Sequence, residues 1–388
     1  MRHHHPRRRG AVVSLAASLL ALTAGQTVSA LPATAAPHPH TPVSAVSAAE
    51  EQAARAIAGS LTDTAWRARV GKATLASDDV AVTALAGKAD GSLKAELAAA
   101  DRRIAAAKGL DAGVGPLLRL RLGDDSMRAA LSAGVTPWVT AASSDDDATA
   151  VTAWDSRGRA HTLDARKAPT HPVYVVDIDG SKALAAGLTV LNKELTRYGV
   201  ASAKATPAKA PTQAPAAGSR AQAAGGGFWT TRITSVELSD DEEPWVKGDA
   251  EIYTLVTGFG QDGAVRVDPV DMPYLDNDGT VYRPNQILVN WSNYKYNLAD
   301  AVMMEEDGST NYRDLAKAIA TVLLTVTDQG TYIPLVNAVL DAIPNDWWTD
   351  DPDYVDSWYT LAQSDNGTRY GARGNGWMTV EPYFVQQF

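Results

Sequence analysis

The sequence contains no cysteine, and none of its seven histidines lies after residue 171. The absence of cysteine excludes disulfides, thiol nucleophiles and zinc–thiolate sites. A serine–histidine–aspartate triad needs a histidine base, and zinc hydrolases usually need histidine ligands, so the chain after residue 171 supports neither. The H-E-x-x-H and G-x-S-x-G motifs are also absent. With no histidine, cysteine or serine catalytic motif, the sequence favours a binding protein over an enzyme.

Long apolar runs are missing as well, because no segment after the N-terminus stays apolar over the roughly 20 residues that cross a bilayer. The N-terminus itself has the three parts of an export signal. Residues 7–9 are arginines, the stretch 11–22 is apolar but short, and residues 33–35 (Ala-Thr-Ala) fit the small-x-small cleavage rule. We therefore expect residues 1–35 to be a signal peptide and the mature protein to be secreted and extracellular.

Composition divides the rest of the chain into four segments. Residues 36–47 are rich in proline, serine and alanine, which is typical of a flexible mature N-terminus. Residues 48–200 predict an α+β domain, and residues 201–227, rich in alanine, proline and glycine, predict a disordered linker. Residues 228–388 predict a second domain, which is an acidic β-sandwich.

The first domain is expected to consist of helices followed by a small sheet. Up to about residue 133 apolar residues recur at helical spacing, as at Leu93, Leu97 and Ile104. From about residue 134 apolar and polar residues alternate, which predicts strands, and one helix follows them. The predicted strands are 136–141, 150–155, 159–163 and 173–178, and the predicted helix is 181–198.

The second domain is expected to be mainly β, because many short alternating segments are separated by polar loops. Its 26 aspartates and glutamates face nine lysines and arginines, which gives a net charge of −17. That charge argues against nucleic acid as a partner and is compatible with divalent cations. The predicted strands are 230–238, 251–258, 265–270, 286–291, 300–305, 354–362 and 377–385, with two inserted helices at 312–327 and 333–343.

Three acidic loops of the second domain predict a calcium site. Calcium takes about six to eight oxygen ligands, mostly carboxylates and carbonyls from flexible loops. A sandwich can supply them by bringing several acidic loops to one end. None of the loops has the EF-hand pattern, and the alternative interpretation is a set of solvated turn residues, since aspartate and glycine favour turns. The candidate ligands of the predicted calcium are Asp240, Asp241, Asp276, Asp278, Glu306 and Asp307.

Tryptophans beside carboxylates offer a second kind of binding site. Trp347 and Trp348 lie in an acidic loop, where the alternatives are stacking on sugar rings and packing on the core. Together with Trp377 they define an alternative function, a carbohydrate- or cell-wall-binding module. A carboxylate-based hydrolase is a further alternative, because paired acids can cleave glycosides without histidine when they face each other across a cleft.

One motif of the first domain is similar to a catalytic loop. Residues 173–181 comprise an apolar strand, an Asp177-Ile178-Asp179-Gly180 turn and the start of a helix, as in the nucleophile loop of haloacid-dehalogenase phosphatases. That fold needs further βα units after the loop, whereas here one helix is followed by the predicted linker. We therefore interpret the motif as a strand that ends in an Asp–Gly turn before a helix.

The second domain also carries a resemblance to a known family. The stretch from Ile233 to Tyr253, with its acidic loop between two strands, resembles the opening of C2-like calcium-binding sandwiches. Residues 302–308 with Asp314 resemble the later acidic loop of such domains. The resemblance implies that calcium supports the sandwich.

Over about residues 50–388 the chain also resembles an uncharacterised family of secreted bacterial proteins with a domain of unknown function. The stretches that carry this resemblance are 154–164, 172–180 and 240–253. It implies a secreted location and no established activity. We expect a secreted protein whose calcium-supported sandwich binds an extracellular protein or a cell-wall polymer.

Overall fold

The structure, a computed structural model, describes most of the chain after residue 43. The predicted signal peptide (1–35), most of the predicted flexible segment (36–47) and nearly all of the predicted linker (201–227) lie outside the described residues. The described residues are 44–142, 148–201, 226–239, 245–247, 250–275, 277, 279–306, 310–343 and 354–386.

The first part of the described chain is helical, as the spacing of its apolar residues predicts. Helix α1 begins at Ala45, slightly before the predicted start at residue 48, because Ser44 caps it. The Ser44 hydroxyl accepts a hydrogen bond from the amide of Ser47 (3.0 Å). Asp63 caps the next helix with its carboxylate in the same way. These helices are α1 (Ala45–Ser60), α2 (Thr64–Ala76), α3 (Val82–Leu85) and α4 (Gly91–Ala107), with a 3₁₀ turn η1 (Lys88–Asp90).

A five-stranded sheet, sheet A, follows in the order β1-β5-β2-β3-β4. The prediction of helices throughout residues 48–133 is wrong at Leu118–Leu122, which forms β1. These residues alternate leucine and arginine, and Asp101 of α4 fixes the start of the strand by accepting the amides of Leu117 and Leu118 (both 2.8 Å). In sheet A β2 and β5 are parallel to each other, and the pairs β1–β5, β2–β3 and β3–β4 are antiparallel. The other elements of this region are η2 (Asp125–Met127), α5 (Arg128–Ser132), β2 (Trp138–Ala141), β3 (Ala150–Trp154), β4 (Ala160–Asp164) and β5 (Val173–Ile178).

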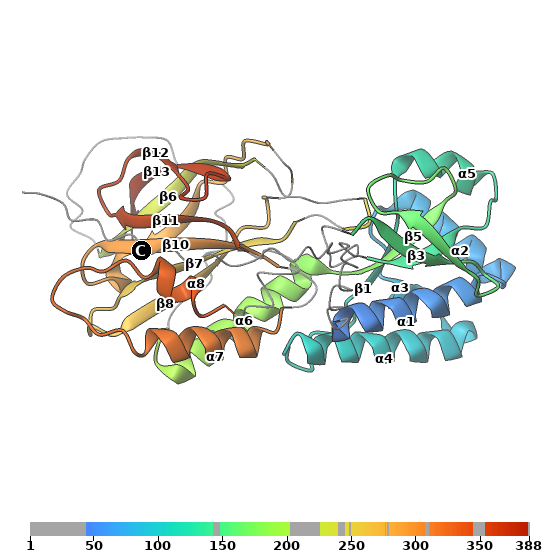
Figure 1. Ribbon diagram of the computed structural model, residues 1–388, viewed down its shortest axis with the longest axis horizontal. Helices are drawn as coiled ribbons and strands as arrows, with labels where there is room; N and C mark the ends of the chain where they lie inside the picture. Colours follow the sequence, from blue (N-terminus) through green and yellow to red (C-terminus); the bar gives the residue numbers. More distant parts are fainter. Residues whose placement is uncertain are drawn as a thin grey trace, which may run out of the picture. The chain divides into compact units, whose positions relative to one another are not determined.

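Helix α6 (Gly180–Tyr198) leaves sheet A and packs on the C-terminal half of the chain. Gly199 ends it with a φ of 81°, a left-handed conformation that glycine adopts without strain. Gly187 lies so close to the ring of Tyr312 that a Cβ atom at this glycine would stand 2.1 Å from it. Figure 1 shows α6 running beside helix α7 (Tyr312–Leu323) and strand β8 (Val265–Asp271), which it contacts.

Two four-stranded antiparallel sheets form the C-terminal half. Sheet B has the order β12-β13-β6-β9, and sheet C has the order β11-β10-β7-β8. Every strand that the sequence predicts here is present, and β12 adds one edge strand that the sequence pattern does not predict. The two inserted helices are present but shorter than predicted. The elements are β6 (Gly227–Leu238), β7 (Ile252–Phe259), β9 (Gln286–Asn290), η3 (Trp291–Asn293), β10 (Leu298–Glu305), α8 (Val336–Leu340), β11 (Tyr354–Ala362), β12 (Gly367–Tyr370) and β13 (Gly376–Gln386).

Strand β7 shows how the layers are stacked, because all of its residues are buried. Side chains of a strand alternate between the two faces of a sheet, so both faces of sheet C are covered. Val256 and Met303 pack in one cluster with Ile233 of sheet B. Leu255 and Val302 point to the other face and pack in the cluster that includes α6 and α7. The structure thus confirms an α+β arrangement followed by a mainly β sandwich with two inserted helices.

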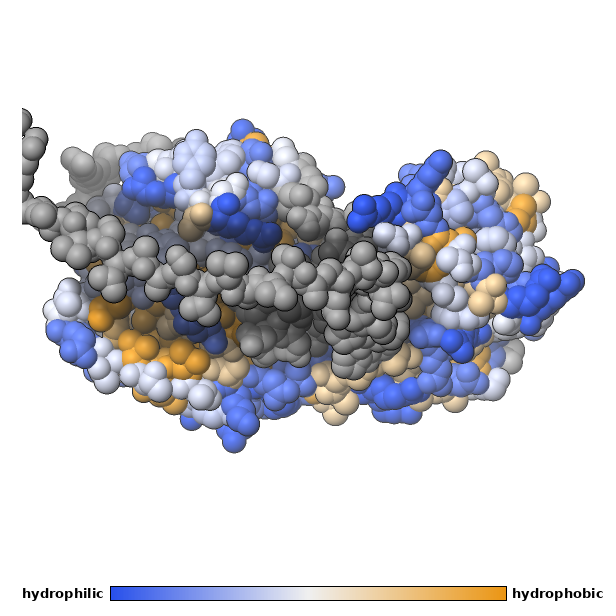
Figure 2. All heavy atoms as spheres, viewed as in Figure 1, coloured by the Kyte–Doolittle hydropathy of each residue, from blue (hydrophilic) through white to orange (hydrophobic). Residues whose placement is uncertain are grey.

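One hydrophobic cluster runs through both halves of the described chain. It joins buried residues of α1, α4 and sheet A to buried residues of α6, α7 and sheet C. Figure 2 shows apolar surface, in orange, over the region where Figure 1 places α7, α8 and β8. No helix in the described part of the chain is long and apolar enough to cross a membrane.

Candidate functional site

The acidic end of the sandwich is the end at which three strands, β6, β8 and β10, reach their last residues, Leu238, Asp271 and Glu305. Each strand is followed by one of the loops that carry the predicted calcium ligands. Glu306 is described by the structure. The other predicted ligands, Asp240, Asp241, Asp276, Asp278 and Asp307, lie outside the described residues.

Backbone hydrogen bonds bring the flanks of these loops together. The amide of Gly279 donates to the carbonyl of Leu238 (2.8 Å), so the loop after β8 reaches the end of β6. The amide of Glu306 donates to the carbonyl of Glu251 (2.8 Å), so the loop after β10 begins beside the segment that leads into β7. Tyr354, which follows the acidic segment 344–353, begins β11 in sheet C at the same end. The flanks of four acidic segments therefore lie at one end of the sandwich.

Asp356 joins the two sheets near the acidic end. It lies on β11 of sheet C, and its carboxylate accepts the amides of Arg373, Asn375 and Gly376 (2.8–2.9 Å) in the turn before β13 of sheet B. Gly371 must be glycine here, because a Cβ atom would stand 2.0 Å from this carboxylate. The fully bonded Asp356 therefore fixes the geometry of the acidic end, and it is a residue that sequence reasoning missed.

Asp271 is a partly buried carboxylate at this end, and the described residues do not fill its hydrogen-bonding capacity. It is the last residue of β8, and its Oδ1 atom is buried without a hydrogen-bond partner among the described residues. Burial raises the pKa of the Asp271 carboxyl, although the amide of Met272 opposes this. Asp271 in turn raises the pKa of Tyr274, which burial alone already lifts above its usual range. A cation beside Asp271 would favour the ionised carboxylate.

The carboxylate of Glu306, a predicted calcium ligand, is bound by other side chains of the protein. It forms an ion pair with the ammonium group of Lys108, at the end of α4, and accepts a hydrogen bond from the hydroxyl of Tyr312. Both charged side chains are buried. The positive charge that compensates Glu306 is therefore supplied by the protein itself.

The tryptophans of the predicted carbohydrate site are only partly described. Trp347 and Trp348 lie outside the described residues. Trp377 is half-buried on β13, and its indole N–H donates to the carboxylate of Glu237 (2.9 Å). It pairs with Tyr370 of β12, which is 77% exposed. The polar group of Trp377 is thus already engaged within sheet B.

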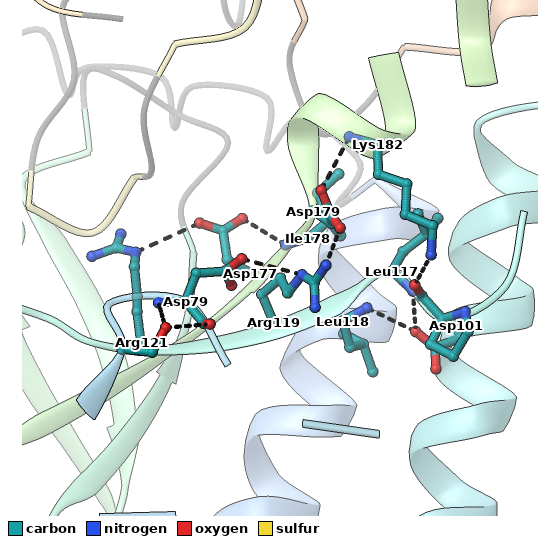
Figure 3. A network of polar contacts seen from close by, with 12 residues as sticks. Asp79, Asp101, Leu117, Leu118, Arg119, Arg121, Asp177, Ile178, Asp179 and Lys182 are labelled. Carbon is teal, nitrogen blue, oxygen red and sulfur yellow. Dashed lines mark hydrogen bonds and ion pairs between the residues drawn. The ribbon is translucent and has the colours of Figure 1, made fainter. Parts of the chain in front are cut away.

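The Asp-x-Asp-Gly motif forms a network of ion pairs at the junction of β5 and α6. Figure 3 shows Arg119 between the carboxylates of Asp79 and Asp179, which both approach it. Asp179 also caps α6 by accepting the amide of Lys182 (3.0 Å). Asp177 accepts the amide of Ile178 and lies 3.8 Å from the guanidinium group of Arg121. The motif is therefore a strand end and a helix cap neutralised by arginines, as the sequence analysis interprets it.

Arg121 extends this network to the first acidic loop of the sandwich. Its guanidinium group donates to the carbonyls of Trp245 (3.1 Å) and Lys247, which lie just beyond that loop. The indole of Trp245 donates to the carbonyl of Asp164 (3.1 Å). Sheet A therefore anchors the segment through which the acidic loop returns to the sandwich. Among the described residues, no group of three or more histidines, aspartates or glutamates is arranged to hold a metal ion.

Comparison with known proteins places the chain in a family. Residues 53–388 match the family described as a protein of unknown function (DUF3103), and the chain belongs to it. No curated protein matches the chain. No solved structure matches it either.

Proposed function

We propose that this member of the family is exported and that its C-terminal sandwich binds calcium at the acidic end, where it meets an extracellular protein or a cell-wall polymer. The single observation that carries the proposal is the hydrogen bonding that brings the flanks of the acidic loops to one end of the sandwich. A calcium ion needs oxygen ligands from several loops, and converging loops can supply them. The N-terminal arginines, the short apolar stretch and the Ala-Thr-Ala sequence support export.

Charge supports the same proposal. The sandwich half has a net charge of −17, and carboxylates held close together repel one another and resist ionisation. Asp271 adds a buried carboxylate oxygen without a partner among the described residues. Because Lys108 already compensates Glu306, we propose Asp240, Asp241, Asp276, Asp278 and Asp307 as the principal ligands, together with Asp271.

The other functions suggested by the sequence have less support. A carboxylate-based hydrolase needs two acids that meet a substrate. Burial raises the pKa of Glu50 well above its usual range, and the charge of Asp177 adds to this. Glu50 is only 5% exposed, however, and this leaves it almost no surface on which to meet a substrate.

Thermal unfolding of the full-length chain after removal of metal tests the proposal. Calcium should raise the melting temperature, because it binds the folded form alone, and the gain is about 2.7 kcal/mol at a concentration of about 100 Kd. Magnesium should stabilise less, because it needs a smaller octahedral site. Joint replacement Asp241→Asn and Asp307→Asn should abolish the calcium effect. Asp341→Asn removes one negative charge at the exposed end of α8 and should leave the calcium effect intact.

A melting curve that millimolar calcium leaves unmoved would mean that the acidic loops are solvated turns. A calcium effect of equal size in the Asp241→Asn and Asp307→Asn variant would place the ion elsewhere. Asp271→Asn tests whether Asp271, at the end of β8, is a calcium ligand. This variant should have a higher melting temperature than the natural chain without calcium, and calcium should raise that temperature less.

A further inference from the structure

A groove of about 540 Å³ opens at the end of the sandwich opposite the acidic end. It lies between the sheets where β6 and β10 begin and where β11 and β13 end. Trp229 and Pro382 line it from sheet B, and Leu298 and Ala362, which pair with each other, line it from sheet C. The remaining lining residues are Tyr296, Asn297, Gln363 and Ser364. A volume of this size suits a small ligand or a few units of a polymer.

The aromatic walls of the groove are held in place by their neighbours. Trp229 is 47% exposed, and its ring packs edge-on against Phe384 (5.3 Å between centroids). Tyr296 donates its hydroxyl to Asp328 (2.6 Å) and packs edge-on against Phe259. A large indole that is half exposed at the mouth of a groove offers a flat apolar face to a ligand.

The polar side chains of the groove have hydrogen-bonding capacity to spare. The side chains of Asn297, Gln363 and Ser364 make no hydrogen bond with the described residues. A backbone hydrogen bond holds these two residues together, because the backbone N–H of Gln363 donates to the backbone carbonyl of Asn297 (3.0 Å). Asn297 has a φ of 52°, in the left-handed region that asparagine adopts more readily than most residues with a side chain. Each side-chain amide offers donors and an acceptor.

Among the residues that the structure describes, no lysine, arginine, aspartate or glutamate lines the groove. A phosphorylated or strongly charged ligand would find no opposite charge there. A lipid chain would leave the amides of Asn297 and Gln363 without partners, which is costly once water is displaced. A proline-rich peptide suits aromatic grooves but offers few donors, because proline has no N–H. A sugar ring has an apolar face and hydroxyls that both donate and accept.

We propose that this groove binds a neutral glycan, with one pyranose ring stacked on Trp229 and its hydroxyls bonded to Asn297, Gln363 and Ser364. The site is independent of the proposed calcium site, because it lies at the other end of the sandwich. It also differs from the tryptophans that the sequence suggests for sugar binding. Trp229 lies at the start of β6, one residue before the strand that the sequence predicts at 230–238.

Isothermal titration of the full-length chain with soluble hexasaccharides tests the proposal. The probes are cellohexaose, the hexamer of N-acetylglucosamine and mannohexaose, with decaproline as the peptide alternative. At least one hexasaccharide should bind, and Trp229→Ala should weaken that binding about tenfold, the loss expected for one aromatic stack. Tyr370→Ala, which removes an exposed aromatic ring outside the groove, should leave the affinity unchanged.

Gln363→Ala gives a second test that does not touch the aromatic packing, and it should also weaken hexasaccharide binding. Circular dichroism and the melting temperature of each variant show whether it is folded. The proposal is overturned if no hexasaccharide binds at millimolar concentration, or if folded Trp229→Ala and Gln363→Ala bind as tightly as the natural chain. Binding of decaproline in preference to every sugar would overturn it in favour of a peptide groove.

Discussion

The ammonium group of Lys108 lies against the carboxylate of Glu306, and neither side chain is exposed to solvent. Lys108 ends α4 in the N-terminal half, and Glu306 follows β10 in the sandwich. Tyr312 adds a hydrogen bond to the same carboxylate, and its amide donates to the carbonyl of Lys108 (3.1 Å). This buried pair therefore joins α4, β10 and α7 through charges that water cannot reach.

Removal of the lysine should be strongly destabilising. Lys108→Met leaves the carboxylate of Glu306 buried without its cation, which typically costs about 3–5 kcal/mol of unfolding free energy. The double variant Lys108→Met with Glu306→Leu removes both charges and should recover much of that loss. Urea unfolding of the single and double variants measures the coupling, with Lys317→Met as the control because Lys317 is exposed on α7. Equal stability of Lys108→Met and the natural chain would show that the pair is not formed.

Asp328 supports a wall of the groove, because it binds the hydroxyl of Tyr296, which lines the groove. Lys295 and the Tyr296 hydroxyl bond to its carboxylate (both 2.6 Å), and together with the amide of Gly330 they lower its pKa to about 2. The unfolded chain should titrate at the ordinary value of about 3.9. The carboxylate therefore stabilises the fold above pH 4, and this contribution is lost as the pH falls from about 4 to about 2.

Asp328→Asn should accordingly lower stability at neutral pH, and its deficit should shrink between about pH 4 and pH 2. Urea unfolding over this pH range measures the difference from the natural chain. Asp341→Asn, at an exposed aspartate for which no side-chain hydrogen bond is formed with the described residues, serves as the control. A deficit that does not change with pH would show that the ion pair with Lys295 is not what stabilises this corner.

The sequence predicts the strands of the sandwich well, because each strand is indicated by residues that are neighbours in the sequence. Alternation along β8 or β13 is set by burial on one face, and it is visible within a few residues. The sequence does not predict β1, because its five alternating residues follow a long helical region. The start of the strand is held by hydrogen bonds to Asp101 of α4, which is not adjacent in the sequence. The apolar residues of β7 are consistent with its continuous burial. The sequence does not show which helices cover its second face, because those helices are separated from β7 along the chain.

The candidate sites also differ in whether residues that are neighbours in the sequence reveal them. The acidic loops are visible in the sequence because their carboxylates are neighbours along the chain. The sequence does not reveal that Lys108 is the partner of Glu306, because the two residues lie in distant segments of the chain. Trp229 lies just before the predicted strand 230–238, and only the pairing of β6 with β13 and the approach of β10 and β11 place it at a groove. Long-range contacts therefore decide which polar residues are structural.

The last prediction tests the contact between α6 and α7, which attaches the N-terminal half to the sandwich. Gly187→Ala would place a methyl group 2.1 Å from the ring of Tyr312, so the helices must separate, and overpacking of this kind costs about 1–3 kcal/mol. Gly59 of α1 is the matched control, because it is also helical but has no heavy atom within 4 Å of an added Cβ. Gly59→Ala should stabilise by about 0.4–1 kcal/mol, since alanine loses less entropy on folding. Chemical denaturation of both variants measures the two opposite shifts. If Gly187→Ala stabilised the chain as Gly59→Ala does, α6 would not pack closely on α7, and the continuous core would be broken there.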